Sequence, residues 1–410
     1  MRIGLVVAGA QCRLRQWLEV HGTTESQPLR ASAANSRRLR AAVRERHPGR
    51  FDEVFSADGV EFRADLIEEV EGGIGLRRLR PATRRKRWHI DELALQVHVL
   101  RRNGLRVVSA EIWRLDRRYR LSGELDLDGA LKKTEHLWAC EARIHQWAAR
   151  VEELTAMPEE EPEVAVGPHC SRPRRCPFAV RCGVPRREPK PGPVQDRIEQ
   201  ARRNGQPVID RSLAEDLASS GPVFALDFEA WAPALPVFQG TAPFEPVVVQ
   251  WSLHRAEGED VRHFGGLATP GSDPRGWLVE SLLEVLDEPG PIYVYSDFER
   301  RALARLAAKD ERVQAIIDRL VDLQALIRAK YVHPDFEGGF GLKRVLPVLV
   351  PGAGFSDLEL ADGGEAALAY GRLVDEDDPA LRAKLEAYCA RDSLALLQIR
   401  QALLARAPIR

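Results

Sequence analysis

Residues 223–229 read VFALDFE, an apolar, strand-like run that ends in two carboxylates separated by one phenylalanine. Successive side chains of a strand point to opposite faces, so Asp227 and Glu229 are expected to point the same way. Two like charges side by side destabilise a strand unless a cation or another partner lies between them. This stretch therefore predicts a strand that carries a cation site.

The charges of the chain separate it into two parts. Residues 1–190 contain 36 Lys and Arg against 27 Asp and Glu, a net charge of +9, whereas the remainder contains 24 against 34, a net charge of −10. The 410 residues are 44% hydrophobic and 30% charged, which is enough for two or three globular domains. The basic first part is better suited to meeting a polyanion.

Proline-rich stretches indicate where one domain ends and the next begins. A Pro- and Glu-rich loop, TAMPEEEPEVAVGPHC, leads into a cysteine cluster, and CGVPRREPKPGPVQD has the composition of a linker. We therefore predict a first domain over residues 1–190, a linker over 191–220 and a second domain over 221–410. Both domains mix helical and strand-like patterns, so the expected fold class is α/β. Strands are predicted at 61–70, 105–115, 223–229, 245–254 and 291–296, and helices at 91–102 and 384–403.

Acidic residues occur at three separate places in the second part. They are Asp227 and Glu229 at the end of a strand, Asp297 and Glu299 where a strand passes into a helix, and Tyr388 with Asp392, four residues apart on one helix face. Carboxylates that converge from separated segments can hold two divalent metal ions about 3.5–4 Å apart, an arrangement that cleaves phosphodiesters in line. Mg²⁺ and Mn²⁺ prefer such oxygen ligands.

This set resembles the DEDD exonucleases of the DnaQ-like, ribonuclease H-related superfamily, in their tyrosine variant. Asp227 and Glu229 match the first motif, and Tyr388 and Asp392 match the third. Glu299 in YSDFE matches the second motif, which usually reads Asn-x-x-Phe-Asp, and Asp297 is the alternative ligand if the register shifts by two.

The resemblance implies a ribonuclease H-like second domain and a metal-dependent 3′–5′ exonuclease that uses two Mg²⁺ or Mn²⁺ ions. Asp227, Glu229, Glu299 and Asp392 would bind the metals, and Tyr388 would position or help to deprotonate the attacking water. The implied substrate is DNA or RNA in single-stranded form.

Three cysteines stand close together in HCSRPRRCPFAVRC, with five residues between neighbours. Cys170, Cys176 and Cys182 make a soft-ligand site that lacks one member, and Cys12 can supply the fourth. A far-upstream cysteine joined to a late triple resembles the iron–sulfur staple of RecB-type nuclease domains, which implies a 4Fe–4S cluster. A zinc site that uses His169 and a set of plain reduced thiols are the alternatives.

The resemblance to RecB-like members of the PD-(D/E)xK nucleases extends over the first domain. Asp65 matches the family's strand aspartate and Gln96 its helix glutamine, but Arg78 and Arg80 stand where the metal-binding Glu and the Lys belong. Because a guanidinium has no lone pair to offer a cation, this domain is expected to be a nuclease fold that has lost its metal site.

A dense basic run, RRLRPATRRKRWH, occupies the same part of the first domain. Arg80, Arg84, Arg85 and Arg87 are the candidates for binding a nucleic-acid backbone, with the adjacent Trp88 stacking on an unpaired base. The alternative is a solvated face with Trp88 packed inside.

The whole chain resembles a bacterial family of uncharacterised function that joins a RecB-like domain and a cysteine cluster to a DnaQ-like domain. An exonuclease and a non-catalytic nucleic-acid-binding or scaffold protein built from two degenerate nuclease folds both remain open. The absence of a cleavable secretion signal and of eighteen consecutive apolar residues predicts a cytoplasmic, non-membrane protein with reduced cysteines. Nothing in the sequence predicts the oligomeric state.

Overall fold

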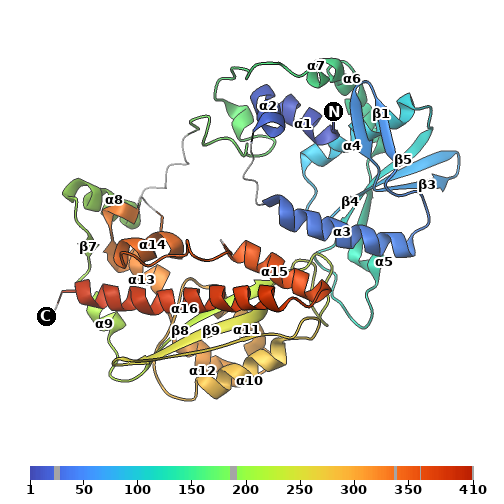
Figure 1. Ribbon diagram of the computed structural model, residues 1–410. Coiled ribbons are helices and arrows are strands. Elements are labelled where there is room, and N and C mark those ends of the chain that lie inside the picture. Colours follow the sequence, from blue (N-terminus) through green and yellow to red (C-terminus); the bar gives the residue numbers. More distant parts are fainter. Residues whose placement is uncertain (23–27, 185–191, 337–338, 361, 409–410) are drawn as a thin grey trace. The chain divides into compact units, whose positions relative to one another are not determined.

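The computed structural model describes residues 1–22, 28–184, 192–336, 339–360 and 362–408 (Figure 1). The chain divides into two compact units, the first formed by Met1–Glu188 with Pro233–Glu245 and the second by Pro189–Ala232 with Pro246–Arg410. Both units are mixed α/β, as the sequence predicts at this level. None of the described helices is both long and apolar enough to cross a membrane.

The first unit contains a four-stranded sheet in the order β3-β4-β5-β6 and a separate antiparallel hairpin of β1 and β2. Strands β4 and β5 are parallel, whereas the two outer pairings are antiparallel. The elements are α1 Ile3–Gln11, α2 Arg13–His21, α3 Pro28–Arg46, β1 Val54–Ala57, β2 Val60–Arg63, β3 Leu66–Val70, β4 Gly73–Arg80, α4 Arg87–Arg102, β5 Val107–Leu115, α5 Leu127–Ala130, β6 Leu131–Glu135, α6 Leu137–Ala148, α7 Val151–Thr155 and η1 Pro168–Cys170.

Helix α4 is the core helix of the first unit. Leu93, Val97 and Leu100 are fully buried on it, in one cluster with side chains of α1 and of the sheet. A second cluster joins α3 to the sheet, and Ala234 of the segment Pro233–Glu245 belongs to it. This segment follows strand β8 of the second unit in sequence and supplies core residues to the first.

The second unit contains a five-stranded sheet in the order β10-β9-β8-β11-β12 and a small pair of β7 and β13. Strands β8, β9 and β10 are antiparallel, and β8, β11 and β12 are parallel. The elements are α8 Pro193–Asn204, β7 Val208–Ile209, α9 Leu213–Leu217, β8 Val223–Trp231, β9 Val247–Glu257, β10 Asp260–Leu267, α10 Arg275–Val285, β11 Ile292–Val294, α11 Phe298–Ala307, α12 Arg312–Asp318, β12 Leu320–Asp322, α13 Leu323–Lys330, β13 Tyr331–Val332, η2 Pro334–Phe336, α14 Leu342–Leu349, α15 Gly363–Asp375 and α16 Pro379–Arg406.

The central strand β8 separates two hydrophobic clusters. Phe224, Leu226 and Phe228 point to the face that α10, α11 and α12 cover, whereas Val223 and Ala225 point to the face that the long helix α16 crosses (Figure 1). The alternation of a strand continues this second series into Asp227 and Glu229. The two carboxylates are therefore expected to point to the same face of the sheet as the apolar side chains of Val223 and Ala225.

The elements predicted from the sequence are present, with two differences. The predicted strand over 61–70 is interrupted at Asp65, so it forms β2 and β3. Residues 191–220, predicted as a linker, contain α8, β7 and α9, and Ile198 and Leu217 contribute to the core of the second unit. The proline-rich start of this region gave the linker composition, while Val194, Ile198 and Ala201 recur at helical spacing behind it.

The contribution of α8 can be tested by truncating its buried anchor. Ile198 is 5% exposed, so Ile198→Ala should lower the free energy of unfolding by about 2–4 kcal/mol. The substitution loses the transfer free energy of the removed groups and leaves a cavity behind. Glu199→Ala on the exposed side of the same helix is the matched control and should change it by less than about 0.5 kcal/mol. Urea denaturation of the full chain measures both. Equal midpoints for the two variants would show that 191–220 acts as a linker.

Candidate metal centre

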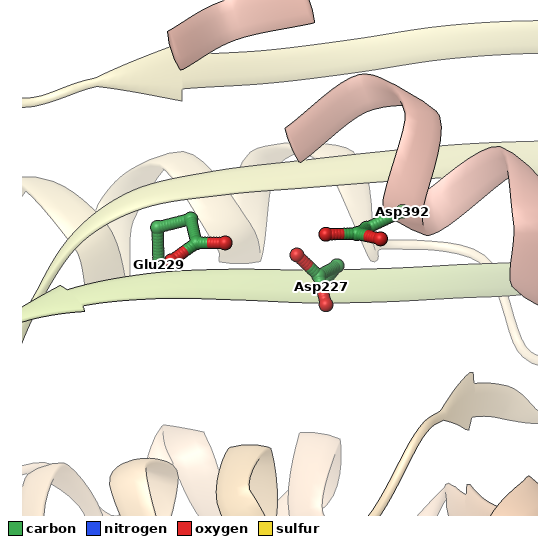
Figure 2. A group of neighbouring side chains, drawn as sticks. All are labelled: Asp227, Glu229 and Asp392. Carbon is green, nitrogen blue, oxygen red and sulfur yellow. The ribbon is translucent and has the colours of Figure 1, made fainter. Parts of the chain in front are cut away.

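Three carboxylates from two elements meet in the second unit. Asp227 and Glu229 come from β8 and Asp392 from α16, and one oxygen of each lies within 4.8 Å of the others (Figure 2). The pairing between β8 and β9 shifts register directly after Glu229, and such a bulge re-aims the side chain beside it. The sequence predicted the two separate pairs, and the fold brings them together.

Burial makes this trio electrostatically costly. Desolvation, followed by repulsion from Asp392, raises the pKa of Glu229 to about 8, and desolvation raises the pKa of Asp392 to about 6. The pKa of Asp227 is also raised well above its ordinary value, first by burial and then by Asp392, Glu229 and Glu299. Hard divalent cations bind such oxygen donors, so the trio can hold a metal ion.

Glu299 is buried close to this trio, whereas Asp297 is exposed. Glu299, on the first turn of α11, is 3% exposed, and its Oε2 atom is buried without a hydrogen-bond partner among the described residues. Burial raises the pKa of Glu299 to about 8, with Asp322 and Glu229 adding repulsion. Asp297 precedes the helix, is exposed and pairs with Arg301 at 3.1 Å. The geometry therefore favours Glu299 as the acid of this segment.

A distorted turn sets the direction in which α11 begins. Ser296 has a φ of 103°, a left-handed conformation that costs a serine of order 1–3 kcal/mol. Asp322 compensates for part of this cost because its Oδ1 accepts from Ser296 N at 3.1 Å while it also caps α13 through Ala325 N at 2.9 Å. Asp322 thus caps α13, and the same carboxylate bonds to the turn that leads to Glu299.

Helix α16 carries Tyr388 and Asp392 on one face, as their spacing predicts. Tyr388 is buried, its hydroxyl is hydrogen-bonded to Asp392, and burial raises the pKa of the phenol above its ordinary value. The helix is buried on several sides because β8 and β9 pack against one flank and α14 and α15 against others.

A cavity of about 830 Å³ opens onto the carboxylates. Asp227, Tyr388 and Asp392 line it, as do Lys343 and Arg344 of α14. The Lys343 ammonium lies 4.8 Å from the centre of the Tyr388 ring, and its charge lowers the pKa of both Glu229 and Asp392. The acidic centre thus faces a space with a cationic wall.

Sequence reasoning missed three neighbours of the site. They are Lys343, the thiol of Cys389 at 3.5 Å from Asp227 Oδ2, and Gly363, where a Cβ would lie 3.4 Å from Glu229 Oε2. Cys389 is fully buried. Its position one residue after Tyr388 was an available signal, whereas nothing local in GFGLKRVL indicates that Lys343 reaches the acids.

The four predicted cluster cysteines lie in one region of the first unit. Cys12 lies between α1 and α2. Burial raises the pKa of Cys176 and of Cys182, and the charge of Cys12 raises both further. The Gln11 side chain donates to the carbonyls of His169 and Arg174 at 2.6 and 2.7 Å, which ties the end of α1 to the cysteine loop. Among the described residues, no three of the thiols lie within 4.8 Å of one another.

In the first unit, for which the sequence predicts a lost metal site, arginine side chains bind Asp65. Asp65 is 1% exposed and is bonded by the guanidinium groups of Arg40 and Arg78, the latter at 2.5 Å. Its second oxygen also accepts from the backbone of Leu79 at 3.0 Å. The carboxylate is therefore fully engaged by the protein itself.

The four predicted nucleic-acid-binding arginines separate into two sets. Arg84, Arg85 and Arg87 are exposed, as a backbone-binding role requires. Arg80 is largely buried and is bonded to Glu92, with its guanidinium 5.4 Å from the centre of the Trp88 ring. A second guanidinium, that of Arg174, lies 5.1 Å from the centre of the same ring, so two cations of the protein itself approach Trp88.

Comparison with known proteins adds one match. A family model described as a domain of unknown function, DUF2779, matches residues 224–341, a segment that includes Asp227, Glu229 and Glu299 and ends before Tyr388. No curated protein and no solved structure matches the chain.

The carboxylate trio can be tested for metal binding without any assay of activity. Mg²⁺ or Mn²⁺ at a hundred times its dissociation constant should raise the free energy of unfolding by about 2.7 kcal/mol, because the cation binds only the folded trio. Asp392→Asn should abolish this gain and, in chelator, should be no less stable than the parent, since one buried like charge is removed.

Asp297→Asn is the matched control for this experiment, because Asp297 is an exposed acid outside the trio. Its thermal unfolding should show the full metal-dependent gain. An Asp392→Asn protein that gains as much stability from Mn²⁺ as the parent would contradict the assignment.

Proposed function

We propose that the second unit is a metal-dependent 3′–5′ exonuclease of the DEDD type, in its tyrosine variant, with a ribonuclease H-like fold. The observation that carries the proposal is the convergence of Asp227, Glu229 and Asp392 beside Glu299, at the end of a cavity that Lys343 lines. Buried acids of this kind destabilise a protein unless they serve a bound cation. The substrate is single-stranded DNA or RNA.

Asp227, Glu229, Glu299 and Asp392 would hold two Mg²⁺ or Mn²⁺ ions. Glu299 Oε2 and Asp392 Oδ1, which are buried without a hydrogen-bond partner among the described residues, support this. When bound, the ions stabilise the attacking and leaving oxygens of an in-line displacement. The residues of the chain supply the positioning. The Tyr388 hydroxyl donates a hydrogen bond to Asp392. Its oxygen can therefore accept a hydrogen bond from a water and orient that water toward the phosphorus.

Lys343 has a separate role in this proposal. Its ammonium stands on the cavity side of the Tyr388 ring, where it can pair with a phosphate oxygen of the strand. The same charge offsets part of the repulsion between Glu229 and Asp392 before substrate enters.

The proposed catalytic centre predicts a graded series of variants on a labelled single strand with Mn²⁺. Asp227→Ala and Asp392→Ala should lower the rate by at least about 10³-fold, since each removes a ligand, whereas Tyr388→Phe should slow turnover about 10²-fold. Glu299→Gln should cost more than its matched control, Asp297→Asn. An Asp227→Ala protein that degrades the strand as fast as the parent would refute the exonuclease.

We further propose that the first unit is a RecB-like nuclease fold that binds nucleic acid without cutting it. Arg78 holds Asp65 in place of a metal ion, and the exposed Arg84, Arg85 and Arg87 supply the charge for a phosphate backbone. A non-catalytic binding protein with both centres inactive is the alternative function, and the same strand-degradation assay separates the two.

The four thiols of the first unit are proposed to hold a 4Fe–4S cluster. The proposal is supported by the resemblance of a far-upstream cysteine joined to a late triple to the iron–sulfur staple of RecB-type nuclease domains, and by the bonds from Gln11 that bring Cys12 to the cysteine loop. A zinc site is the alternative. Cys12, Cys170, Cys176 and Cys182 would be its ligands.

Protein purified without oxygen should therefore be brown and contain about four iron atoms per chain. Cys12→Ser should remove most of the visible absorption and iron, because it deletes one of four ligands. Cys140→Ala, which alters a buried thiol outside the group, is the matched control and should stay brown. Colourless parent protein that contains one zinc per chain would replace the iron–sulfur proposal with a zinc site.

A further inference from the structure

A second cavity, of about 430 Å³, lies in the first unit where the sheet meets α4. Arg78 and Arg80 of β4 line it, with Arg2 and Arg63 at its exposed part. Two glutamates, Glu61 and Glu92, also line it. Four cations against two anions give the lining a formal net charge of +2.

The inner arginines are bonded to carboxylates but are not saturated by them. Arg78 pairs with Asp65 at 2.5 Å and approaches Glu92 at 3.7 Å, and Arg80 also pairs with Glu92. The Nε–H groups of Arg78 and Arg80 are nevertheless buried without an acceptor among the described residues. The protein therefore leaves the hydrogen-bonding capacity of both guanidinium groups incompletely used.

A neutral side chain completes the lining. Gln96 of α4 is 3% exposed, and its Oε1 atom has no hydrogen-bond partner within the part of the chain that the structure describes. Nothing therefore fixes its amide against presenting the NH₂ group to an anion. Burial and repulsion from Arg78 also lower the pKa of Arg80 well below its ordinary value, a cost that a bound anion would relieve.

The outer arginines have no competing partner. Among the described residues, neither Arg2 nor Arg63 takes part in an ion pair or a side-chain hydrogen bond, although both line the cavity. A phosphate monoester carries about −1.5 to −2 at neutral pH and three acceptor oxygens, whereas an internal phosphodiester carries only −1. The monoester therefore matches the charge of +2 and the number of donors better.

We propose that this cavity binds a phosphate monoester group, and that its source is the terminal phosphate of a nucleic-acid strand. The inference rests on the proposed nucleic-acid binding by the first unit and names the group that this unit recognises. A site of this kind would hold a strand by its end, whereas the exposed Arg84, Arg85 and Arg87 would contact its backbone irrespective of position.

The test measures binding in chelator, so that no strand is degraded, with full-length protein and fluorescent single strands of one sequence. Strands that end in a 5′-phosphate, in a 3′-phosphate or only in hydroxyls are compared, and inorganic phosphate is added as competitor. One phosphorylated strand should bind at least about tenfold more tightly than the hydroxyl strand. The double variant Arg2→Ser, Arg63→Ser should bring that preference close to one.

Arg117→Ser, which removes an exposed arginine of the same unit outside the cavity, is the matched control and should retain the preference. Gln96→Leu, an apolar replacement of similar size, should reduce the preference without removing the outer charges. Competition by inorganic phosphate with no preference among the strands would keep the monoester site but assign it to a free phosphate compound. Equal affinities with no competition by phosphate, or a preference that survives the double variant, would overturn the proposal.

Failure of the exonuclease proposal would look different. A protein that degrades nothing in Mn²⁺ but still prefers a phosphorylated end in chelator would retain the phosphate site and lose the exonuclease. A protein that degrades strands without any such preference would do the reverse.

Discussion

The mutual repulsion of buried carboxylates is the constraint on which the second unit depends. Asp227, Glu229 and Asp392 are held within 4.8 Å of one another in a largely desolvated place, where charged groups are most expensive. The packing of α16 across β8 brings them together, and Lys343 offsets part of the repulsion. The arrangement is intelligible if a cation completes it, because a purely structural core would place apolar residues at these positions.

The two units contain buried acids in opposite electrostatic settings. In the first, Asp65 is neutralised by Arg40 and Arg78, so the protein itself supplies the countercharge. In the second, Asp227 has the thiol of Cys389 at 3.5 Å and lies beside Glu229 and Asp392. Charge balance around a buried acid is therefore what separates a site that has no need of a metal from one that does. The same difference leaves surplus positive charge in the first unit, available for an anion.

Local patterns in the sequence were sufficient for part of this structure. The alternation in VFALDFE predicted β8 and its two acids, and the four-residue spacing predicted that Tyr388 and Asp392 share a face. Whether Asp297 or Glu299 faces the site depends on where α11 begins. The turn at Ser296 precedes that point, and Asp322, which bonds to this turn, lies 26 residues further along the chain. Lys343 and the packing of Arg80 against Glu92 arise from tertiary contacts that leave no periodic signal.

Contacts within the protein close the long chain segment between Cys12 and the cysteine loop. Bringing Cys12 to Cys170 closes a loop whose entropic cost rises only logarithmically with its length. Gln11, the residue before Cys12, already donates to two carbonyls of the cysteine loop, and Cys176 N bonds to Cys170 O at 2.8 Å. These hydrogen bonds and the packing behind them meet much of the closure cost. Bonds between the thiols and a bound cluster would then stabilise the first unit, because the free energy of loop closure is already offset by other contacts.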